Sequence, residues 1–298
     1  MTDSAATTSA TRKPHGTDTR ETTESTESAN DLWPSGHRLA VALNVMYEQW
    51  EPGTAPGIGP VGNPLPAGAT DYQALSWSDY GRRTGIWRLL ELFRRYDVRA
   101  SVYPSAILAE TAPDSLRAIV ADGHELCGHS WAQNIIAACL DIDAERKLIG
   151  RTLDALEDTT GQRPVGWVSP RCTPSASTAQ LLAEAGLEWF GDVFDSDLPY
   201  RIDTESGPIV GLPFDLDVND MPLHIRYGQP HRELLSSFID TFDGLRAEGR
   251  KAYLDVTVHA HIGARPAGRA VLAKLIEHAT ADGDCWIATR AELAATVR

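Results

Sequence analysis

The sequence predicts a single domain of the α/β class whose strands form a closed or nearly closed barrel. From Arg38 onward, short apolar or β-branched runs alternate with segments whose apolar residues recur at helical spacing, giving about seven strand–helix units. Most connections between these units are short. No G-x-G-x-x-G sequence follows the first expected strand, so nothing favours an open nucleotide-binding sheet. The expected architecture is therefore a distorted (β/α)7, TIM-like barrel.

The first half of the chain contains one unusually long connection. An expected strand at residues 39–45 leads into a loop over residues 46–80 that is rich in Pro and Gly. A helix is expected at residues 85–96, because four apolar residues fall at i, i+3, i+4 and i+7. A second helix opens at Pro113 and stops at Gly123, whose missing Cβ suits a left-handed cap. The other elements expected here are strands at residues 100–103, 124–128 and 165–168 and a helix at residues 143–158.

The second half of the chain continues the same alternation, and glycines again follow the helical segments. The elements expected here are strands at residues 187–192, 208–214, 252–258 and 285–288, helices at residues 176–185, 233–248 and 267–281, and a short helix at the C-terminus. No internal repeat is visible beyond the strand–helix alternation itself.

The charge of the chain argues against two classes of partner. The formal net charge is −14, and the sequence has no basic cluster to overcome it. Phosphate backbones and anionic lipid surfaces are repelled by such a field. We therefore expect a small-molecule substrate, with no nucleic acid and no membrane partner. A homo-oligomer is compatible with the sequence.

The N-terminus and the cysteines indicate a cytoplasmic protein. Residues 1–36 are rich in Thr, Ser, Ala and Glu and contain no apolar run of the kind that a secretory signal needs. We expect these residues to form a disordered tail before a barrel domain at residues 37–298. The four cysteines show no C-x-x-C spacing and are expected to be reduced thiols.

Polar residues follow the ends of most expected strands. In a barrel of parallel strands these ends lie on one face, where the chemistry takes place. Each residue also has a structural interpretation: a turn for an Asn-Asp pair, packing for a tryptophan, a loop anchor for an arginine. Their convergence on one face favours function. The residues are Asn44, Tyr47 and Glu48 after the first strand, His129, Trp131 and Gln133 after the third, Arg171 after the fourth, Asp192 and Asp197 after the fifth, Asn219 and Asp220 after the sixth, and His259 and His261 after the seventh.

Several short motifs carry a family resemblance. They are Tyr80-Gly81-Arg82, Gly85-Ile86-Trp87-Arg88, Gly123-His124-Glu125, His129-Ser130-Trp131, Asp197-Leu198-Pro199-Tyr200, Asn219-Asp220-Met221, and His259 with Gly263-Ala264-Arg265-Pro266. In this order and spacing, over residues 39–297, the chain resembles the polysaccharide deacetylase (NodB-homology) superfamily and, more closely, its allantoinase-like branch. The resemblance implies a hydrolase of carbon–nitrogen bonds other than peptide bonds.

The chain departs from the metal site that the resemblance implies. Typical members bind a divalent metal through a first-strand Asp and two histidines spaced H-x-x-x-H, with a second Asp as the base. Here the first-strand positions hold Asn44 and Met46, the second histidine is Gln133, and only His129 remains. Asn and Met are poor zinc ligands. We therefore expect no metal cofactor; zinc or another divalent ion held by Glu48, His129 and His259 is the alternative.

The sequence thus predicts an amidohydrolase that opens a small cyclic amide, ureide or imide. Glu48 is expected to act as the general base for water, His129 to orient water or substrate, Arg171 to hold the carbonyl oxygen, and His259 to protonate the leaving nitrogen. The loop at residues 52–69 is expected to cover the site. The residues expected to contact the substrate are Tyr47, Trp131, Asp197, Asn219 and Asp220.

Two other functions fit the same sequence. One is metal-dependent N-deacetylation of an amino sugar or a secondary metabolite. The other is a catalytically inactive barrel that binds a ligand without turnover.

Overall fold

The computed structural model describes residues 32–55, 65–66 and 68–297. Residues 1–31 of the expected tail and residues 56–64 of the expected lid lie outside the described residues, so both predictions stay predictions there. The folded part begins before residue 37, because Trp33 is buried and its indole N–H donates to the carbonyl oxygen of Ala252 at 2.7 Å. The tail therefore does not extend to residue 36 as expected.

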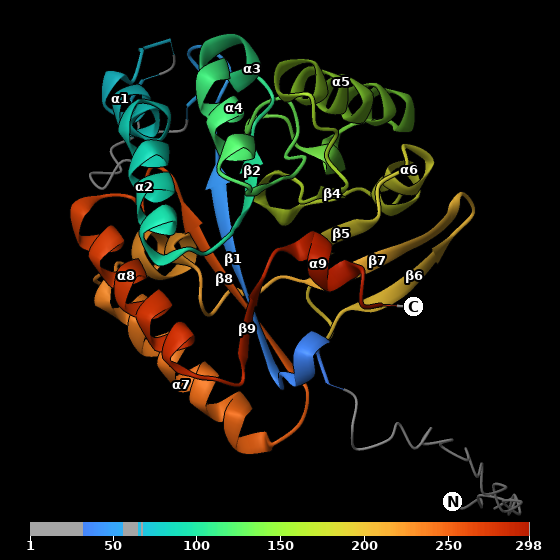
Figure 1. Cartoon of the computed structure of the whole chain (residues 1–298). Coiled ribbons are helices and arrows are strands. Elements are labelled where there is room, and N and C mark those ends of the chain that lie inside the picture. The colour runs from blue at the N-terminus through green and yellow to red at the C-terminus, as the bar shows by residue number, and fades with distance from the viewer. Residues whose placement is uncertain (1–31, 56–64, 67, 298) are drawn as a thin grey trace, which may run out of the picture. The chain divides into compact units, whose positions relative to one another are not determined.

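The described part of the chain forms the expected barrel from seven strands (Figure 1). The first group of strands runs β3, β2, β1, β8, with β1 at its centre. The second group runs β4, β5, β7. A parallel bridge between Gly128 and Trp167 joins β3 to the second group. The strands are β1 (Leu39–Tyr47), β2 (Ser101–Pro104), β3 (Glu125–Leu126), β4 (Gly166–Trp167), β5 (Trp189–Val193), β7 (Gly207–Pro213) and β8 (Ala252–His259). This arrangement confirms the predicted α/β class.

The barrel closes between β7 and β8 mainly through side chains. One backbone bond, from the Thr257 N–H to the Val218 oxygen at 3.0 Å, connects the two segments. The side-chain contacts across this closure come from Arg290. Its fully buried guanidinium donates to the carbonyl oxygens of Leu212 at 3.1 Å and Pro213 at 2.8 Å. The same guanidinium pairs with Asp255 of β8. A buried ion pair therefore completes the ring of strands.

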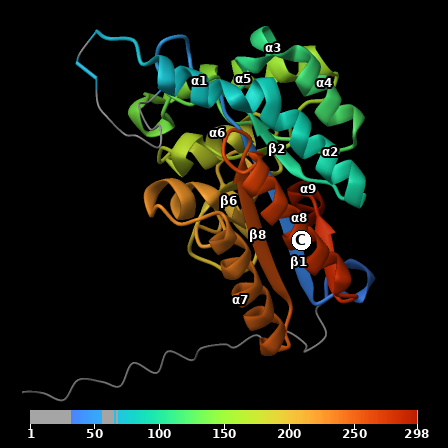
Figure 2. The ribbon, with the colours of Figure 1, turned by 90° about the vertical axis from the view of Figure 1, so that its left-hand side faces the viewer.

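Helices cover the outside of the barrel, as Figures 1 and 2 show. The main buried cluster lies between these helices and the strands. The longer helices are α2 (Ile86–Tyr96), α4 (Pro113–Ala121), α5 (Ile142–Thr160), α6 (Thr178–Glu184), α7 (Arg232–Glu248) and α8 (Pro266–Ala281). The shorter elements are α3 (Leu108–Thr111), α9 (Arg290–Ala294), and η1 (Pro34–Gly36), η3 (Ala137–Cys139) and η4 (Pro170–Cys172). Most boundaries agree with the predicted ones within a few residues.

Three features were not predicted. The end of the expected loop forms helix α1 (Tyr72–Tyr80), which the Asp71 carboxylate caps through the Ala74 N–H at 2.9 Å. It continues into α2 through η2 (Gly81–Gly85), which is a π-helix, as is η5 (Met221–Arg226). Strand β6 (Tyr200–Thr204) pairs antiparallel with β7, outside the ring. Strand β9 (Cys285–Ala288) was expected. It pairs with residues 39–42 of β1, and β2 pairs with residues 44–47 on the same edge of β1.

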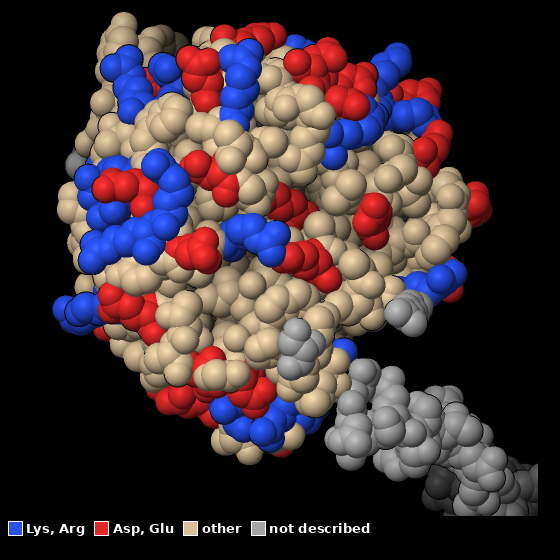
Figure 3. Space-filling model, in the orientation of Figure 1, with Lys and Arg blue, Asp and Glu red and all other residues tan. Residues whose placement is uncertain are grey.

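The surface is consistent with the absence of a basic patch in the sequence. Figure 3 shows Lys and Arg side chains interspersed with Asp and Glu over the face in view. No helix in the described ranges is long and apolar enough to cross a membrane. The four cysteines are all free thiols, as the sequence predicted.

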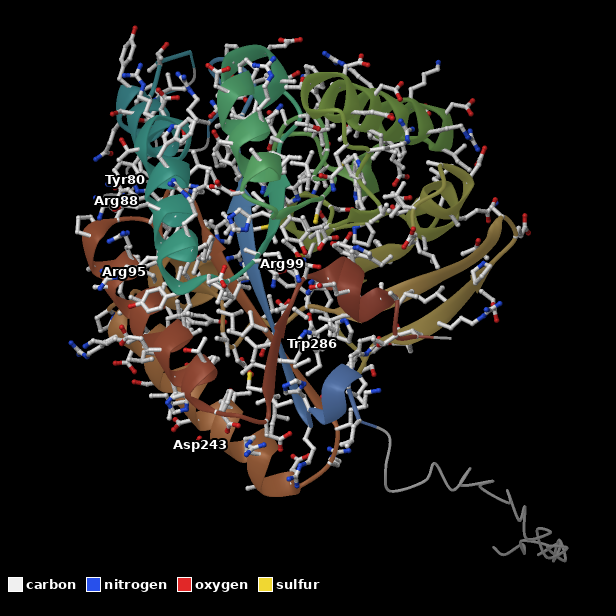
Figure 4. All side chains as sticks on the ribbon, in the orientation of Figure 1. Tyr80, Arg88, Arg95, Arg99, Asp243 and Trp286 are labelled. Atoms are coloured by element: carbon white, nitrogen blue, oxygen red, sulfur yellow. The ribbon has the colours of Figure 1, made fainter. Side chains whose placement is uncertain are left out.

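The start of α2 is packed directly against the loop that follows β8. A Cβ placed on Gly85 would lie 1.9 Å from the carbonyl oxygen of Ala260, which is backbone and has no freedom to swing away. Arg88, which is labelled near Tyr80 in Figure 4, donates to the Ala264 oxygen at 2.9 Å. The Arg265 guanidinium lies 4.3 Å from the ring centre of Tyr80. These contacts brace the loop at residues 259–265 from one side.

We expect Gly85→Ala to destabilise the protein by about 1–3 kcal/mol, because the added methyl forces the backbone at Ala260 to move. Gly150→Ala is the matched control: Gly150 lies inside α5 with nothing within 4 Å of its Cβ position. That change should stabilise the protein by roughly 0.5–1 kcal/mol. Urea unfolding followed by circular dichroism measures both. Equal midpoints for Gly85→Ala and the wild type would contradict the close packing.

Candidate active site

The alternation of side chains along β1 determines which residues face the barrel interior. Val45 and Tyr47 pack outward against the helices, whereas Ala42 and Met46 face inward. Glu48, the next residue after the strand, has the same parity as Met46 and lies at the mouth of the barrel with 4% of its surface exposed. The carboxylate is therefore a buried group at the carboxyl end of the central strand.

Three histidine side chains face the Glu48 carboxylate. Nε2 of His129 lies 3.8 Å and Nε2 of His259 lies 3.6 Å from Oε1, and Nε2 of His261 lies 4.0 Å from Oε2. All three rings are buried, with 2%, 6% and 0% of the residue surface exposed, respectively. The strand ends after β1, β3 and β8 thus bring their side chains together, as the sequence predicted for Glu48, His129 and His259.

Hydrogen bonds from neighbouring strands fix two of these rings. Nδ1 of His129 lies 2.7 Å from the carbonyl oxygen of Val168, and because this oxygen can only accept, Nδ1 carries a proton. Nδ1 of His259 lies 2.6 Å from Oδ1 of Asp220, whose oxygens also accept the His259 backbone N–H. Both rings therefore turn Nε2 toward Glu48.

The charges in this cluster favour an ionised Glu48. Burial alone would raise the pKa of Glu48, but His259, His129 and His261 outweigh burial and lower that pKa to about 2. Burial alone would lower the pKa of His259. The Glu48 and Asp220 carboxylates outweigh this effect, so the pKa of His259 lies above its ordinary value. Burial lowers the pKa of His261 to about 4, which keeps that ring neutral near pH 7.

Gln133 holds one oxygen of Glu48 and leaves the other free. Its Nε2 donates to Glu48 Oε1, while Glu48 Oε2 is buried without a hydrogen-bond partner among the described residues. Buried polar atoms without partners are rare in native proteins and point to a group that binds there. The unpaired buried atoms of the cluster are Glu48 Oε2, His129 Nε2, Gln133 Oε1, and Nδ1 and Nε2 of His261.

Two residues that we expected to contact substrate lie in the packed interior instead. Tyr47 is fully buried on the helix side of β1, and its hydroxyl bonds with the Ser115 hydroxyl of α4 at 2.8 Å. Trp131 is 5% exposed in the main core, with the Arg151 guanidinium 3.4 Å from its ring centre. Strand parity explains the outward direction of Tyr47, and both predicted substrate contacts are corrected to packing roles.

Asn219 and Asp220 also have structural partners. Asn219 Oδ1 accepts the Met221 N–H at 3.0 Å, which is the turn-forming interaction common for asparagine. Asp220 is 1% exposed, and both of its oxygens are engaged by His259. The predicted substrate-binding role of this pair is therefore replaced by a turn and by the orientation of His259.

Asp197 and Arg171 lie away from these contacts. Asp197 is exposed and lines a separate cavity of about 420 Å³ with Phe214 and Asp215, and none of the residues facing Glu48 lines it. Arg171 is exposed on η4 with a left-handed backbone at φ 59°, and it has no hydrogen bond or ion pair with another described residue. The structure does not bring either residue against Glu48.

Three strand-end residues to which the sequence assigned no role become candidates in the structure. Gln133 and His261 contact or face Glu48, as described above. Asp192 is 8% exposed, accepts the Ser169 N–H on both oxygens at 3.0 and 2.9 Å, and burial raises its pKa to about 7. Each follows a strand end, so position alone could have selected them. Their neighbours in space, on which their roles depend, could not be read from the sequence.

Comparisons with known proteins assign the chain to a family. The family model for polysaccharide deacetylases matches residues 71–190. A solved structure described as a probable polysaccharide deacetylase from Pseudomonas aeruginosa PAO1 is 31% identical, with 88% of this chain and 92% of that chain covered and a TM-score of 0.78. This chain belongs to the polysaccharide deacetylase family. It is therefore a carbon–nitrogen hydrolase of that family.

Other members of the polysaccharide deacetylase family that resemble this chain differ in their named activities. A structure of PuuE allantoinase is 29% identical, covers 88% of this chain and 91% of its own, and superimposes with a TM-score of 0.79. A curated peptidoglycan deacetylase from Helicobacter pylori is 25% identical over 70% of this chain and 82% of its own length.

The residues at the metal positions of the polysaccharide deacetylase family do not fit a metal in this chain. The Asn44 amide is used inside the barrel, where Nδ2 donates to Asp255 at 2.6 Å and Oδ1 accepts the Tyr103 hydroxyl at 3.0 Å. Met46 is 2% exposed in the inner core, and Gln133 binds Glu48. Among the described residues, no group of three or more His, Cys, Asp or Glu is arranged to hold a metal ion.

We expect Tyr47→Phe to leave kcat and KM unchanged, because the Tyr47 hydroxyl faces α4 rather than the site. The change removes one buried hydrogen bond and should lower the free energy of unfolding by about 1 kcal/mol. Steady-state kinetics together with thermal unfolding check both expectations. A large loss of kcat with unchanged stability would restore Tyr47 to the substrate site.

Proposed function

We propose that this enzyme opens a small cyclic amide, ureide or imide, with Glu48 as the base. The observation that carries the proposal is the ionised, buried Glu48 with one oxygen held by Gln133 and the other unpaired. A carboxylate with one unpaired oxygen, whose other oxygen lies 3.6 Å from Nε2 of His259, is suited to take a proton from water and pass it on. The similarity to a protein named an allantoinase supports a cyclic substrate.

The chemistry begins with a water molecule bound at Glu48 Oε2. Glu48 takes one proton as the water oxygen attacks the ring carbonyl carbon, and His129 Nε2 accepts the second O–H and aims the attack. The carbon–nitrogen bond of the tetrahedral intermediate then breaks, and His259 donates its Nε2 proton to the leaving nitrogen. The products are a carboxylic acid and the freed nitrogen group at the two ends of the opened ring.

The proton then returns through the same two residues. His259 Nε2 lies 3.6 Å from Glu48 Oε1, so a small movement carries the proton from Glu48 to His259. Asp220 stabilises the charged imidazolium in the meantime, because its carboxylate accepts the Nδ1 proton. Stabilisation of the carbonyl oxygen by Arg171 stays a prediction, because η4 holds this side chain exposed to solvent.

Space for a substrate begins one residue after Glu48, although the Glu48 side chain does not itself line it. A cavity of about 450 Å³ begins at Gln49 and Trp50, directly after Glu48, and reaches Tyr72 of α1. The Trp50 ring also meets the His261 ring edge-on, with 5.6 Å between centres, so the wall of this cavity adjoins the histidine cluster. A volume of this order accommodates a small organic ring.

Metal-dependent N-deacetylation of an amino sugar is the second candidate. The similarity to the H. pylori peptidoglycan deacetylase favours it. Against it stands the donor set at the family's metal positions, where Asn44 and Met46 face the barrel interior and offer no carboxylate.

Glu48→Gln should lower kcat by about 10²–10⁴-fold, because the amide cannot take a proton from water. The assay is hydrolysis of allantoin, hydantoin, succinimide and an N-acetyl sugar before and after chelation, with metal content measured by elemental mass spectrometry. Glu184→Gln is the control, because Glu184 is exposed on α6, outside the Glu48 cluster and the cavity at Gln49 and Trp50. Chelator-sensitive release of acetate, with stoichiometric zinc, would instead favour the deacetylase.

The pH profile of ring opening should fall on the alkaline side as His259 loses its proton. The pKa of His259 lies above its ordinary value because Glu48 and Asp220 outweigh the effect of burial. Asp220→Asn removes one of these charges and should move the alkaline limb to lower pH. The measurement is kcat/KM against pH for the wild type, Asp220→Asn and Asp192→Asn. If the alkaline limb moves in Asp192→Asn but not in Asp220→Asn, the limb reports the Asp192 carboxyl and not His259.

A further inference from the structure

The hydrogen bond to Glu48 fixes which end of the Gln133 amide points away from Glu48. An ionised carboxylate only accepts hydrogen bonds, so the NH₂ group of Gln133 must face Glu48 Oε1, as the structure shows. The amide oxygen of Gln133 then points elsewhere. This residue is 6% exposed, and its Oε1 is buried without a partner among the described residues.

The unpaired atoms around Glu48 contain more acceptors than donors. Glu48 Oε2 and Gln133 Oε1 can only accept hydrogen bonds, whereas the His261 ring carries one N–H and has its Nε2 4.0 Å from Glu48 Oε2. A catalytic water has two O–H groups. If they point to Glu48 Oε2 and His129 Nε2, as proposed above for attack, the oxygen of Gln133 receives no hydrogen bond from this water. An N–H group on the substrate can supply that hydrogen bond.

We propose that Gln133 accepts a hydrogen bond from a ring N–H of the substrate, so that the enzyme selects N-unsubstituted cyclic imides and ureides. The inference rests on the proposed ring opening and assigns to Gln133 a part in specificity. A ring of this class has an N–H directly beside its carbonyl carbon, so the group that Gln133 binds is adjacent to the carbon that water attacks. An N-alkylated ring leaves the buried Gln133 oxygen unpaired, which a polar site penalises strongly.

The test compares succinimide with N-methylsuccinimide, and hydantoin with 3-methylhydantoin, in the wild type and in Gln133→Met. We expect the wild type to prefer the N–H ring by roughly 10- to 100-fold in kcat/KM. Gln133→Met is close in size but has no amide oxygen, so its preference should fall toward unity. Gln133→Met also loses the hydrogen bond from Gln133 to Glu48, and this loss should lower kcat/KM equally for the N–H ring and the N-methyl ring.

The ratio separates recognition of the N–H from exclusion of the methyl group by size. Simple exclusion would give the same ratio in the wild type and Gln133→Met, and that result would overturn the proposal. Gln180→Met is the control, because it makes the same change on α6, outside the Glu48 cluster and the cavity at Gln49 and Trp50. It should keep the wild-type ratio.

A second variant guards against misfolding of Gln133→Met. Gln133→Glu keeps an acceptor atom but cannot donate to Glu48, so it should retain the N–H preference while kcat falls. Loss of the preference in Gln133→Glu would contradict the inference. If the wild type opens rings through Glu48 but the ratio is unchanged in Gln133→Met, only this inference is wrong. If the wild type opens no ring, the proposed function is wrong as well.

Discussion

The ion pair between Asp255 and Arg290 is the interaction on which the rest of the barrel depends. Both side chains are buried, and the guanidinium reaches from α9 to the carbonyl oxygens at the end of β7. Breaking a buried pair by removing one partner costs about 3–5 kcal/mol. The same Asp255 oxygen accepts the Asn44 amide at 2.6 Å, where a carboxylate would be repelled. The pair that closes the barrel therefore favours the neutral Asn44 over the ligand that the family resemblance implies.

The candidate site follows from the directions that neighbouring strands impose on a few polar groups. Glu48 inherits its inward direction from the parity of β1, and the carbonyl oxygen of Val168 and the carboxylate of Asp220 turn His129 and His259 toward it. Three imidazoles then compensate the desolvation of one carboxylate, which explains why the pKa of Glu48 falls to about 2 despite burial. The candidate groups are thus positioned by backbone atoms and strand ends.

The sequence predicted the barrel because helical spacing and β-branched runs are local signals, and it placed Glu48, His129 and His259 correctly because strand ends share one face. Tyr47 was assigned to the wrong side, although alternation along β1 was enough to place it with the helices. The roles of Asp220 and Gln133 depend on partners 39 and 85 residues away, which no local pattern reveals. The hairpin of β6 was missed because its short alternating run lies outside the strand–helix repeat.

The pairing of β1 with the last strands has a consequence for synthesis. Leu39 pairs with both Ala252 and Cys285, whereas β2 pairs only with residues 44–47 of β1. The first half of β1 therefore finds its strand partners only after β8 and β9 have been made. Contacts of such long sequence separation form slowly, and a nascent chain exposes this apolar part of β1 until then.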